Sequence, residues 1–206
     1  MPMAYLFKNG MEECEYELMK RKPNENEMVW FAMAAPYRRE LKAVEQLKDH
    51  GVDCFVPMRW EVIDKGNVKK KKKVPAISNL LFVHDTRAHM KELKKVIPII
   101  QYHTQPTSTG AREVVIVPKA QMEHFMKICT SEDNGLRYLT LDEIQRKLKA
   151  GSHVRIIGGA FNGVEGYYIT IKGVRNRRLV VTIPDLVAAS VEVTPDVVEV
   201  IEEEKP

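Results

Sequence analysis

The sequence GSHVRIIGGAFNGVEGYYITI, residues 151–171, decides the fold of the C-terminal part of the chain. The β-branched residues within 154–157 favour one strand, Gly158-Gly159 favours a turn, and residues 167–171 favour a second strand. Two further glycines permit a positive φ or a close approach of backbones, as small, sharply bent sheets require: Gly163 and Gly166. This spacing implies no catalytic group. An ordinary hairpin with a glycine-rich turn is the alternative interpretation.

The sequence after Gly151 favours β structure throughout. Its short β-branched segments are separated by turn residues at the spacing that is typical of small closed sheets. Strands are predicted at residues 154–157, 167–174, 179–183, 191–193 and 197–201. The pattern therefore predicts a small all-β barrel over residues 150–202, followed by an acidic tail at 203–206.

The upstream residues 29–130 alternate apolar strands with amphipathic helices, which predicts a helix-covered α/β sheet. The first helix is expected over residues 37–50 and should end at Gly51. Its inward residues are predicted to be Tyr37, Leu41, Val44 and Leu47. A second helix is expected after a cap at Asp85 or Thr86, and a third after Pro118. Strands are expected near residues 29–33, 54–58, 79–83, 99–103 and 113–117, with a polar loop at 104–110.

Two segments do not fit either domain. Residues 1–28 show no sustained periodicity and are expected to form a weakly ordered N-terminal extension. Residues 131–149 are interpreted as a linker with a short helix, since Thr140 and Glu143 form a capping box. The chain is therefore expected to contain two domains.

The composition of the chain restricts its function classes. The net charge of +4 and the pI near 8.8 admit nucleic acid as a partner without requiring it. Three widely spaced cysteines, Cys14, Cys54 and Cys129, suggest neither a disulfide framework nor a zinc site. No apolar run is long enough to span a bilayer, and no secretory signal is evident at the N-terminus. We expect a cytoplasmic protein.

No set of residues supports a reaction. The six histidines lack metal-binding spacing, and the glycines of GGAFNGVEG are not followed by the Lys-Ser/Thr of a phosphate loop. Glu165 has no partner acid or histidine at a defined spacing. We therefore expect a binding protein without cofactor, metal or enzymatic activity.

Basic residues are the main candidates for binding. The lysines 69–73 are expected on the returning arm of a protruding hairpin over residues 59–76, where they can contact phosphates. Arg38, Arg39 and Lys42 on the first helix would add to this surface. The alternative for the lysine run is a solubilising edge that protects a sheet.

Taken in order, the segment at 30–58, the hairpin, and the segments at 77–83, 116–128 and 151–171 resemble the NusG family of transcription factors, and the last of them resembles a KOW motif. The segments CFVPM and SNLLFV look closest to the RfaH-like and UpxY-like antiterminators of surface (capsular) polysaccharide operons. The resemblance implies an α+β N-terminal (NGN) domain with a mixed sheet and an SH3-like KOW barrel. It also implies a non-enzymatic factor that binds RNA polymerase and suppresses pausing or termination in specific operons.

The resemblance also suggests the binding residues. By position, the clamp helices of the largest polymerase subunit would contact Ile77, Leu80 and Phe82, although the family's usual Phe-Pro-Gly-Tyr is Ile-Ser-Asn-Leu here. Non-template DNA or nascent RNA would contact the first helix and the hairpin. The residues offered there are Arg38, Arg39, Lys42, Gln46, His50, Lys69, Lys70, Lys71, Lys72 and Lys73.

In the family, the loop between the third and fourth barrel strands recruits a second partner, such as a ribosomal protein or the factor Rho. That loop is expected at residues 183–189, with Pro184, Leu186 and Val187 as contacts. It lacks the aromatic anchor of general NusG proteins, which argues against Rho. The chain is expected to be monomeric, with the C-terminal domain a barrel at rest. A KOW-type RNA-binding or ribosome-associated protein without polymerase contact is the alternative.

Overall fold

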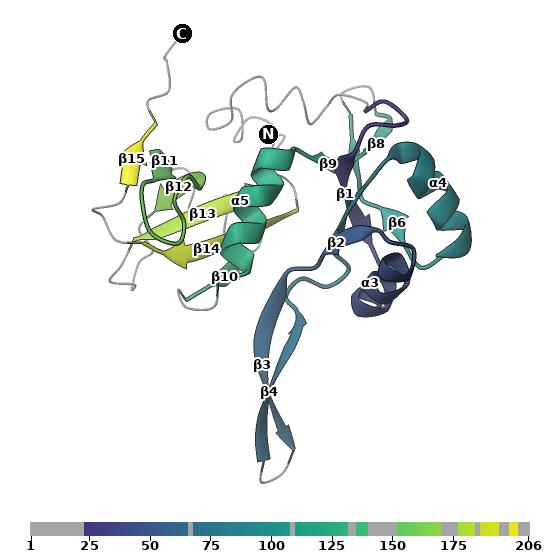
Figure 1. Cartoon of the computed structure of the whole chain (residues 1–206). Coiled ribbons are helices and arrows are strands. Elements are labelled where there is room, and N and C mark those ends of the chain that lie inside the picture. Colours follow the sequence, from purple (N-terminus) through teal and green to yellow (C-terminus); the bar gives the residue numbers. More distant parts are fainter. Residues whose placement is uncertain are drawn as a thin grey trace. The chain divides into compact units, whose positions relative to one another are not determined.

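The computed structural model describes residues 23–65, 68–107, 110–131, 135–139, 152–169, 177–183, 186–193 and 198–201, with the side chains of 64, 65 and 68 excepted. The chain divides into two compact units (Figure 1). One comprises Met19–Lys119, and the other comprises Met1–Leu18 with Ala120–Pro206. Within the described residues, none of the helices has the length and apolar character needed to cross a membrane.

The unit Met19–Lys119 is built on an antiparallel sheet. Its strands are β1 (Val29–Ala34), β2 (Asp53–Phe55), β5 (Leu81–Asp85) and β6 (Gln101–Tyr102), in the order β2-β5-β1-β6, and β9 (Ile116–Val117) also pairs with β1. Helix α3 (Glu40–Asp49) joins β1 to β2, and α4 (Arg87–Val96) joins β5 to β6. Each helix therefore connects two strands that run in the same direction with an antiparallel strand between them, a split β-α-β arrangement.

The prediction of a mixed sheet does not agree with the strand pairs that the structure describes. All pairs in this sheet are antiparallel. The physical reason is the split connection, because β5 lies between β1 and β2 and prevents them from pairing directly. The alternation of strands and helices predicted the crossovers correctly, but it does not encode which strand is placed between the two.

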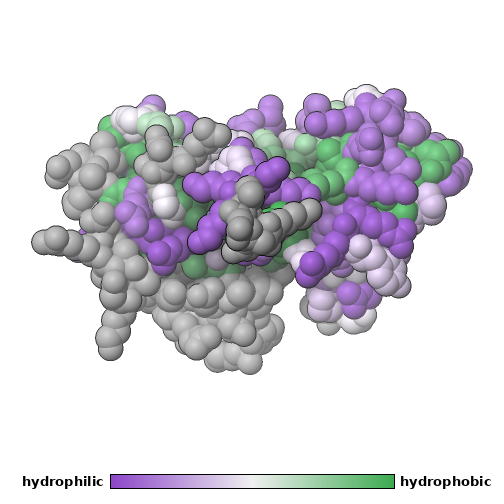
Figure 2. Space-filling model, turned by 90° about the horizontal axis from the view of Figure 1, so that it is seen from below, coloured by the Kyte–Doolittle hydropathy of each residue, from purple (hydrophilic) through white to green (hydrophobic). Residues whose placement is uncertain are grey.

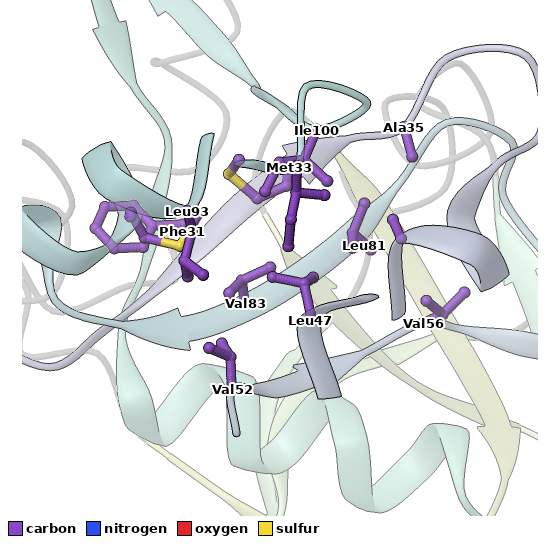
Figure 3. Packing of buried hydrophobic residues seen from close by; sticks show 13 residues of the cluster. Phe31, Met33, Ala35, Leu47, Val52, Val56, Leu81, Val83, Leu93 and Ile100 are labelled. Atoms are coloured by element: carbon purple, nitrogen blue, oxygen red, sulfur yellow. The ribbon is translucent and has the colours of Figure 1, made fainter. Parts of the chain in front are cut away.

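The apolar core lies between this sheet and the two helices (Figure 3). Phe31 and Met33 of β1 pack with Leu47 of α3 and Leu93 of α4, and all four side chains are buried. The residues that alternate with them in the strands are also buried, among them Ala32 and Phe82. Both faces of the sheet are therefore apolar, which explains why the strands read as nearly continuous hydrophobic runs.

Helix α3 begins later than its sequence pattern predicts. Tyr37 and Arg38 adopt φ values of 64° and 57°, so the chain cannot be helical there, and α3 starts at Glu40. The predicted inward stripe is therefore wrong at its first two residues, since Tyr37 is 85% exposed and Leu41 is 46% exposed, whereas Leu47 is buried and Val44 packs against the core as predicted. The buried residues of α3 are Glu40, Ala43 and Leu47. The predicted end is confirmed, with Gly51 at φ 71°.

Helix α4 agrees with its sequence pattern. The hydroxyl of Thr86 accepts a hydrogen bond from the amide of His89, as expected of an N-cap. Met90 and Leu93 are buried, and the helix ends at Val96, two residues before Pro98. The segment before β1 contacts this helix, since Glu25 accepts a hydrogen bond from Lys91 at 2.8 Å. The rest of the predicted extension, residues 1–22, lies outside the described residues.

Two hairpins extend the unit. β3 (Met58–Lys65) pairs with β4 (Val68–Pro75) in a hairpin that projects from the sheet (Figure 1). β7 (Thr104–Pro106) pairs with β8 (Arg112–Val114), so the segment predicted as a polar loop begins with a strand. Polar residues can form a strand here because the backbone pairs with β8 across the hairpin.

The other unit contains helix α5 (Lys119–Cys129) from Ala120 onward and a six-stranded antiparallel sheet. Its strands are β10 (Arg137–Leu139), β11 (Ser152–Ile156), β12 (Glu165–Ile169), β13 (Arg178–Ile183), β14 (Val187–Glu192) and β15 (Val198–Val200), in the order β10-β14-β13-β12-β11-β15. The five strands predicted from the sequence correspond to β11–β15. β10 falls within the predicted linker, and the helix expected at Thr140–Glu143 lies outside the described residues, as does the acidic tail.

The glycines of residues 151–171 have the backbone roles that were expected. Gly158, Gly159 and Gly163 all have positive φ. A side chain at Gly166 would place its Cβ 2.5 Å from the carbonyl oxygen of Val180 on the neighbouring strand. Gly166 is therefore required because two backbones approach closely.

Arg178 connects the predicted linker to this sheet. Its side chain is fully buried and donates hydrogen bonds to the Ser190 carbonyl at 2.8 Å and to the Glu192 carboxylate at 3.0 Å. It also donates a hydrogen bond to the carbonyl of Gly135, just before β10. The segment 135–139 is thus held on the C-terminal sheet by a buried cation as well as by strand pairing.

Candidate nucleic-acid interface

The lysines of the β3–β4 hairpin form an exposed basic strand. Lys69, Lys70, Lys71, Lys72 and Lys73 are consecutive on β4 and all are exposed. Glu61 is the only acidic residue among the hairpin side chains that the structure describes, and it lies 3.7 Å from Arg59. The view from the side toward which the hairpin points shows mainly hydrophilic residues around it (Figure 2). This surface can attract phosphates.

The strand register gives the hairpin two different faces. Trp60 lies opposite Lys73, and Val62 lies opposite Lys71, so these four side chains share one face. The other face carries Glu61 opposite Lys72 and Ile63 opposite Lys70. Trp60 and Val62 are 58% and 57% exposed, which is high for apolar side chains. The ammonium of Lys73 lies 5.0 Å from the centre of the Trp60 ring, within cation–π range.

The loop before α3 adds further exposed basic groups. Arg38 and Arg39 are exposed, and the Arg39 guanidinium lies 5.1 Å from the centre of the exposed Tyr37 ring. Left-handed backbone at two successive residues that are not glycine costs on the order of 1–3 kcal/mol for each residue. Such a conformation persists only where the surrounding structure imposes it, and neighbouring Glu40 is held firmly.

A chain of polar contacts joins this loop to the base of the hairpin. The buried carboxylate of Glu40 accepts a hydrogen bond from the backbone amide of Asn79. The Asn79 carbonyl in turn lies 3.0 Å from Nε2 of His103. The amide of Ala76 donates to the carbonyl of Pro57 and closes the hairpin at its base. The start of α3 and the segment that leaves the hairpin are therefore fixed relative to each other.

The sequence pattern did not predict this polar chain. Glu40 falls within the helix predicted over residues 37–50 without an assigned role, and Asn79 was predicted to be the first residue of a strand. Asn79 instead has φ 63° and precedes β5, a conformation that asparagine tolerates better than most residues. The one available signal was an asparagine directly before a buried strand, and that signal does not identify its partner.

The remaining residues predicted on α3 lie along the helix at intervals of four. Lys42 and His50 are exposed, whereas Gln46 is half-buried. The ring nitrogen Nδ1 of His50 lies 2.8 Å from the Gln46 carbonyl oxygen, so His50 caps the helix end as well as facing solvent. Lys42 is thus the predicted residue of this helix best placed to meet a phosphate.

The residues predicted to bind polymerase differ in exposure. Ile77 is half-buried, whereas Leu80 and Phe82 are 2% and 0% exposed. Phe82 lies in β5 opposite Ala32 and Phe55, on the sheet face that does not contribute to the core against α3 and α4. Ile77 belongs to the segment held by Glu40 and is the accessible member of this set.

The predicted partner loop of the C-terminal sheet is shorter than expected. β13 ends at Ile183 and β14 begins at Val187, so Val187 is a buried strand residue rather than part of the loop. Its neighbours pair with β13, and this pairing favours strand over loop. Leu186 is half-buried, and Pro184 lies outside the described residues.

Over the part of the chain that the structure describes, no three His, Cys, Asp or Glu side chains cluster in a way that could hold a metal. The basic hairpin, the arginine loop and the polar chain that links them are thus the main chemical features of the first unit.

The comparisons agree with this arrangement. Residues 28–126 match the family described as transcription termination factor nusG. No curated protein matches the sequence. The matched range contains the split β-α-β sheet, the basic hairpin and the arginine loop, and it reaches into α5. Residues 28–126 are therefore similar to the NusG family domain.

Proposed function

We propose that this chain is a transcription elongation and antitermination factor that binds RNA polymerase and the nucleic acid beside it. The proposal rests on one observation: a domain similar to that of the NusG family carries a projecting hairpin with five consecutive exposed lysines. Contacts of this kind, from ammonium to phosphate, are largely independent of base sequence. The factor would therefore depend on polymerase for its placement.

In this proposal the N-terminal domain binds the clamp helices of the largest polymerase subunit through the segment that contains Ile77. The hairpin and the arginine loop contact the exposed non-template DNA strand and thereby reduce pausing or termination. The C-terminal sheet, read as a KOW barrel, recruits a second partner such as a ribosomal protein. The narrower part of the proposal is that the factor acts in surface polysaccharide operons, and this part rests on the sequence resemblance alone.

Co-purification with RNA polymerase tests the proposal. Ile77→Glu should abolish retention of polymerase, because an unpaired charge would be desolvated in the contact. Ile77 suits this test better than Leu80, whose burial means that a charge there would also disturb folding. Val96→Glu is the control, since Val96 is an exposed apolar residue on α4, 61% exposed.

Equal retention of the two variants would contradict the assigned polymerase contact. Recovery of ribosomal subunits without polymerase from the native cell would favour the alternative, a KOW-type RNA-binding or ribosome-associated protein. A pause assay on a purified elongation complex then separates binding from effect. The unmodified chain should shorten pauses that Ile77→Glu leaves unchanged.

A further inference from the structure

We infer that the β3–β4 hairpin binds single-stranded nucleic acid on one face only, with bases stacked on Trp60 and phosphates held by Lys71 and Lys73. We call this set, with Val62, the tryptophan face. The opposite set, Arg59, Glu61, Ile63, Lys70 and Lys72, is the glutamate face. The inference rests on the proposed function, and it adds which face of the hairpin makes the contact and which side chains meet the base and the phosphate.

Exposure is the first argument. The chain has two tryptophans, and their environments differ sharply. Trp30 is 8% exposed and stacks on His84 with ring centres 4.8 Å apart, whereas Trp60 is 58% exposed. Val62, two residues along the same strand, extends the apolar strip. A flat aromatic surface open to solvent is what an unpaired base requires for stacking.

Charge is the second argument: near the base of the hairpin, the glutamate face carries a carboxylate and the tryptophan face carries none. On the glutamate face Glu61 lies opposite Lys72 and also 3.7 Å from Arg59, so a carboxylate competes with a phosphate there. On the tryptophan face the cations nearest the ring are Lys71 and Lys73.

Geometry is the third argument. Residues two apart on one face of a strand lie roughly 7 Å apart, so Lys73 beside Trp60 and Lys71 beside Val62 form two successive pairs along the hairpin. The Lys73 ammonium already lies 5.0 Å from the ring centre. A base on the exposed part of the ring would bring its phosphate within reach of the same ammonium group. Duplex DNA, whose bases are already stacked, offers no such contact.

The test compares variants of the full chain that remove equal charge from opposite faces. Lys71→Ala with Lys73→Ala removes two lysines from the tryptophan face, and Lys70→Ala with Lys72→Ala removes two from the glutamate face. Binding of a fluorescent oligothymidine is measured over a range of salt concentrations. The first pair should lower the salt slope by about 0.7 for each lost contact, and the second pair should change it little.

The tryptophan is tested separately. Trp60→Ala should weaken oligothymidine binding by roughly 5- to 150-fold, the range that base stacking supplies, and Trp60→Phe should restore most of it. Oligothymidine should quench the fluorescence of the unmodified chain. The signal left in Trp60→Phe, which comes from buried Trp30, should not be quenched.

The possible outcomes are distinct. Equal weakening by the two lysine pairs overturns the one-face inference while the nucleic-acid contact of the proposed function stands. Loss of polymerase retention in Trp60→Ala with unchanged oligothymidine binding overturns it by showing a protein contact. If the unmodified chain binds no oligothymidine, the inference and the DNA part of the proposed function both fail, and the polymerase contact is judged by Ile77→Glu alone.

Discussion

The carboxylate of Glu40, in the first turn of α3, accepts a hydrogen bond from the backbone amide of Asn79, 39 residues further along the chain. Glu40 is 1% exposed, so this contact is made away from water. It fixes the segment that contains Ile77 against the arginine loop. The two parts of the candidate interface are thus held together by a buried acid rather than by any basic residue.

Removal of this acid should destabilise the N-terminal domain. Glu40→Ala leaves the Asn79 amide without its acceptor and should lower the free energy of unfolding by about 1–3 kcal/mol. Glu40→Gln retains an acceptor oxygen and should cost less. Urea unfolding followed by tryptophan fluorescence reports on this domain, because Trp30 and Trp60 both lie in it. Glu45→Ala, which removes an exposed acid of α3, is the control, and an effect as large as that of Glu40→Ala would contradict the prediction.

A methyl group at Gly166 should separate β12 from β13. The added Cβ would lie 2.5 Å from the Val180 carbonyl oxygen, and backbone cannot move aside without breaking the ladder. Gly166→Ala should therefore cost about 1–3 kcal/mol or more. Gly159→Ala, at φ 66° with no atom within 4 Å, should cost only about 1 kcal/mol through backbone strain. Hydrogen exchange of the β12 and β13 amides measures both, and the reverse order would disprove the steric account.

Loss of Arg178 should release β10 from the C-terminal sheet. Arg178→Met removes the donor that Arg178 supplies to the carbonyls of Gly135 and Ser190 and should cost on the order of 3 kcal/mol. Arg177→Met is a matched control, because the Arg177 guanidinium is at the surface over the Tyr168 ring. Faster hydrogen exchange at residues 137–139 in the first variant only is the expected result. Equal exchange in the two variants would show that strand pairing alone holds β10.

The stability of the second unit should decrease in mild acid because of His124. Burial lowers the pKa of His124 from its ordinary value of 6.5, and the nearby carboxylates of Glu165 and Glu123 only partly oppose this. Since the unfolded chain then binds more protons, the free energy of unfolding falls as the pH drops below 6.5 toward the folded pKa. Unfolding at about pH 7.5 and about pH 5.5 should show a smaller difference for His124→Gln than for the unmodified chain. An unchanged difference would assign the acid sensitivity to other groups.

The two described cysteines should react slowly with alkylating reagents. Burial raises the pKa of Cys129 to about 12. Burial also raises the pKa of Cys54, although the positive charge of Lys48 acts to lower it. Thiolate is the reactive form, so little of either residue is available at neutral pH. In a Cys14→Ser background, peptide mass spectrometry after iodoacetamide treatment should find Cys129 modified more slowly than Cys54. Faster modification of Cys129 would contradict the burial that raises its pKa.

Sequence reasoning succeeded where local chemistry determines the structure. The Thr86 cap, the end of α3 at Gly51 and the glycine turns at 158–159 follow from residue type within one or two turns of chain. The register of the hairpin, and hence its two faces, could have been anticipated once the turn was located, since side chains alternate along a strand.

Contacts between distant residues account for the failures. The left-handed backbone at Tyr37 and Arg38 shortens α3, yet neither residue type favours that conformation. Glu40 and Asn79 are ordinary polar residues until the fold brings them together. Arg178 reads as one of several surface arginines, although it is the largest fully buried side chain described. Burial of a charged group depends on partners that a local pattern does not contain.

The hairpin has a further consequence through its place in the chain. It leaves β2 after Phe55 and returns before Leu81, and those two strands are direct neighbours in the sheet, with Phe55 opposite Phe82. The hairpin thus begins and ends at nearly the same point of the sheet. Its length and charge can therefore change without altering the register between β2 and β5. Mutation can therefore change the surface of the hairpin while the sheet beneath it keeps its strand pairing.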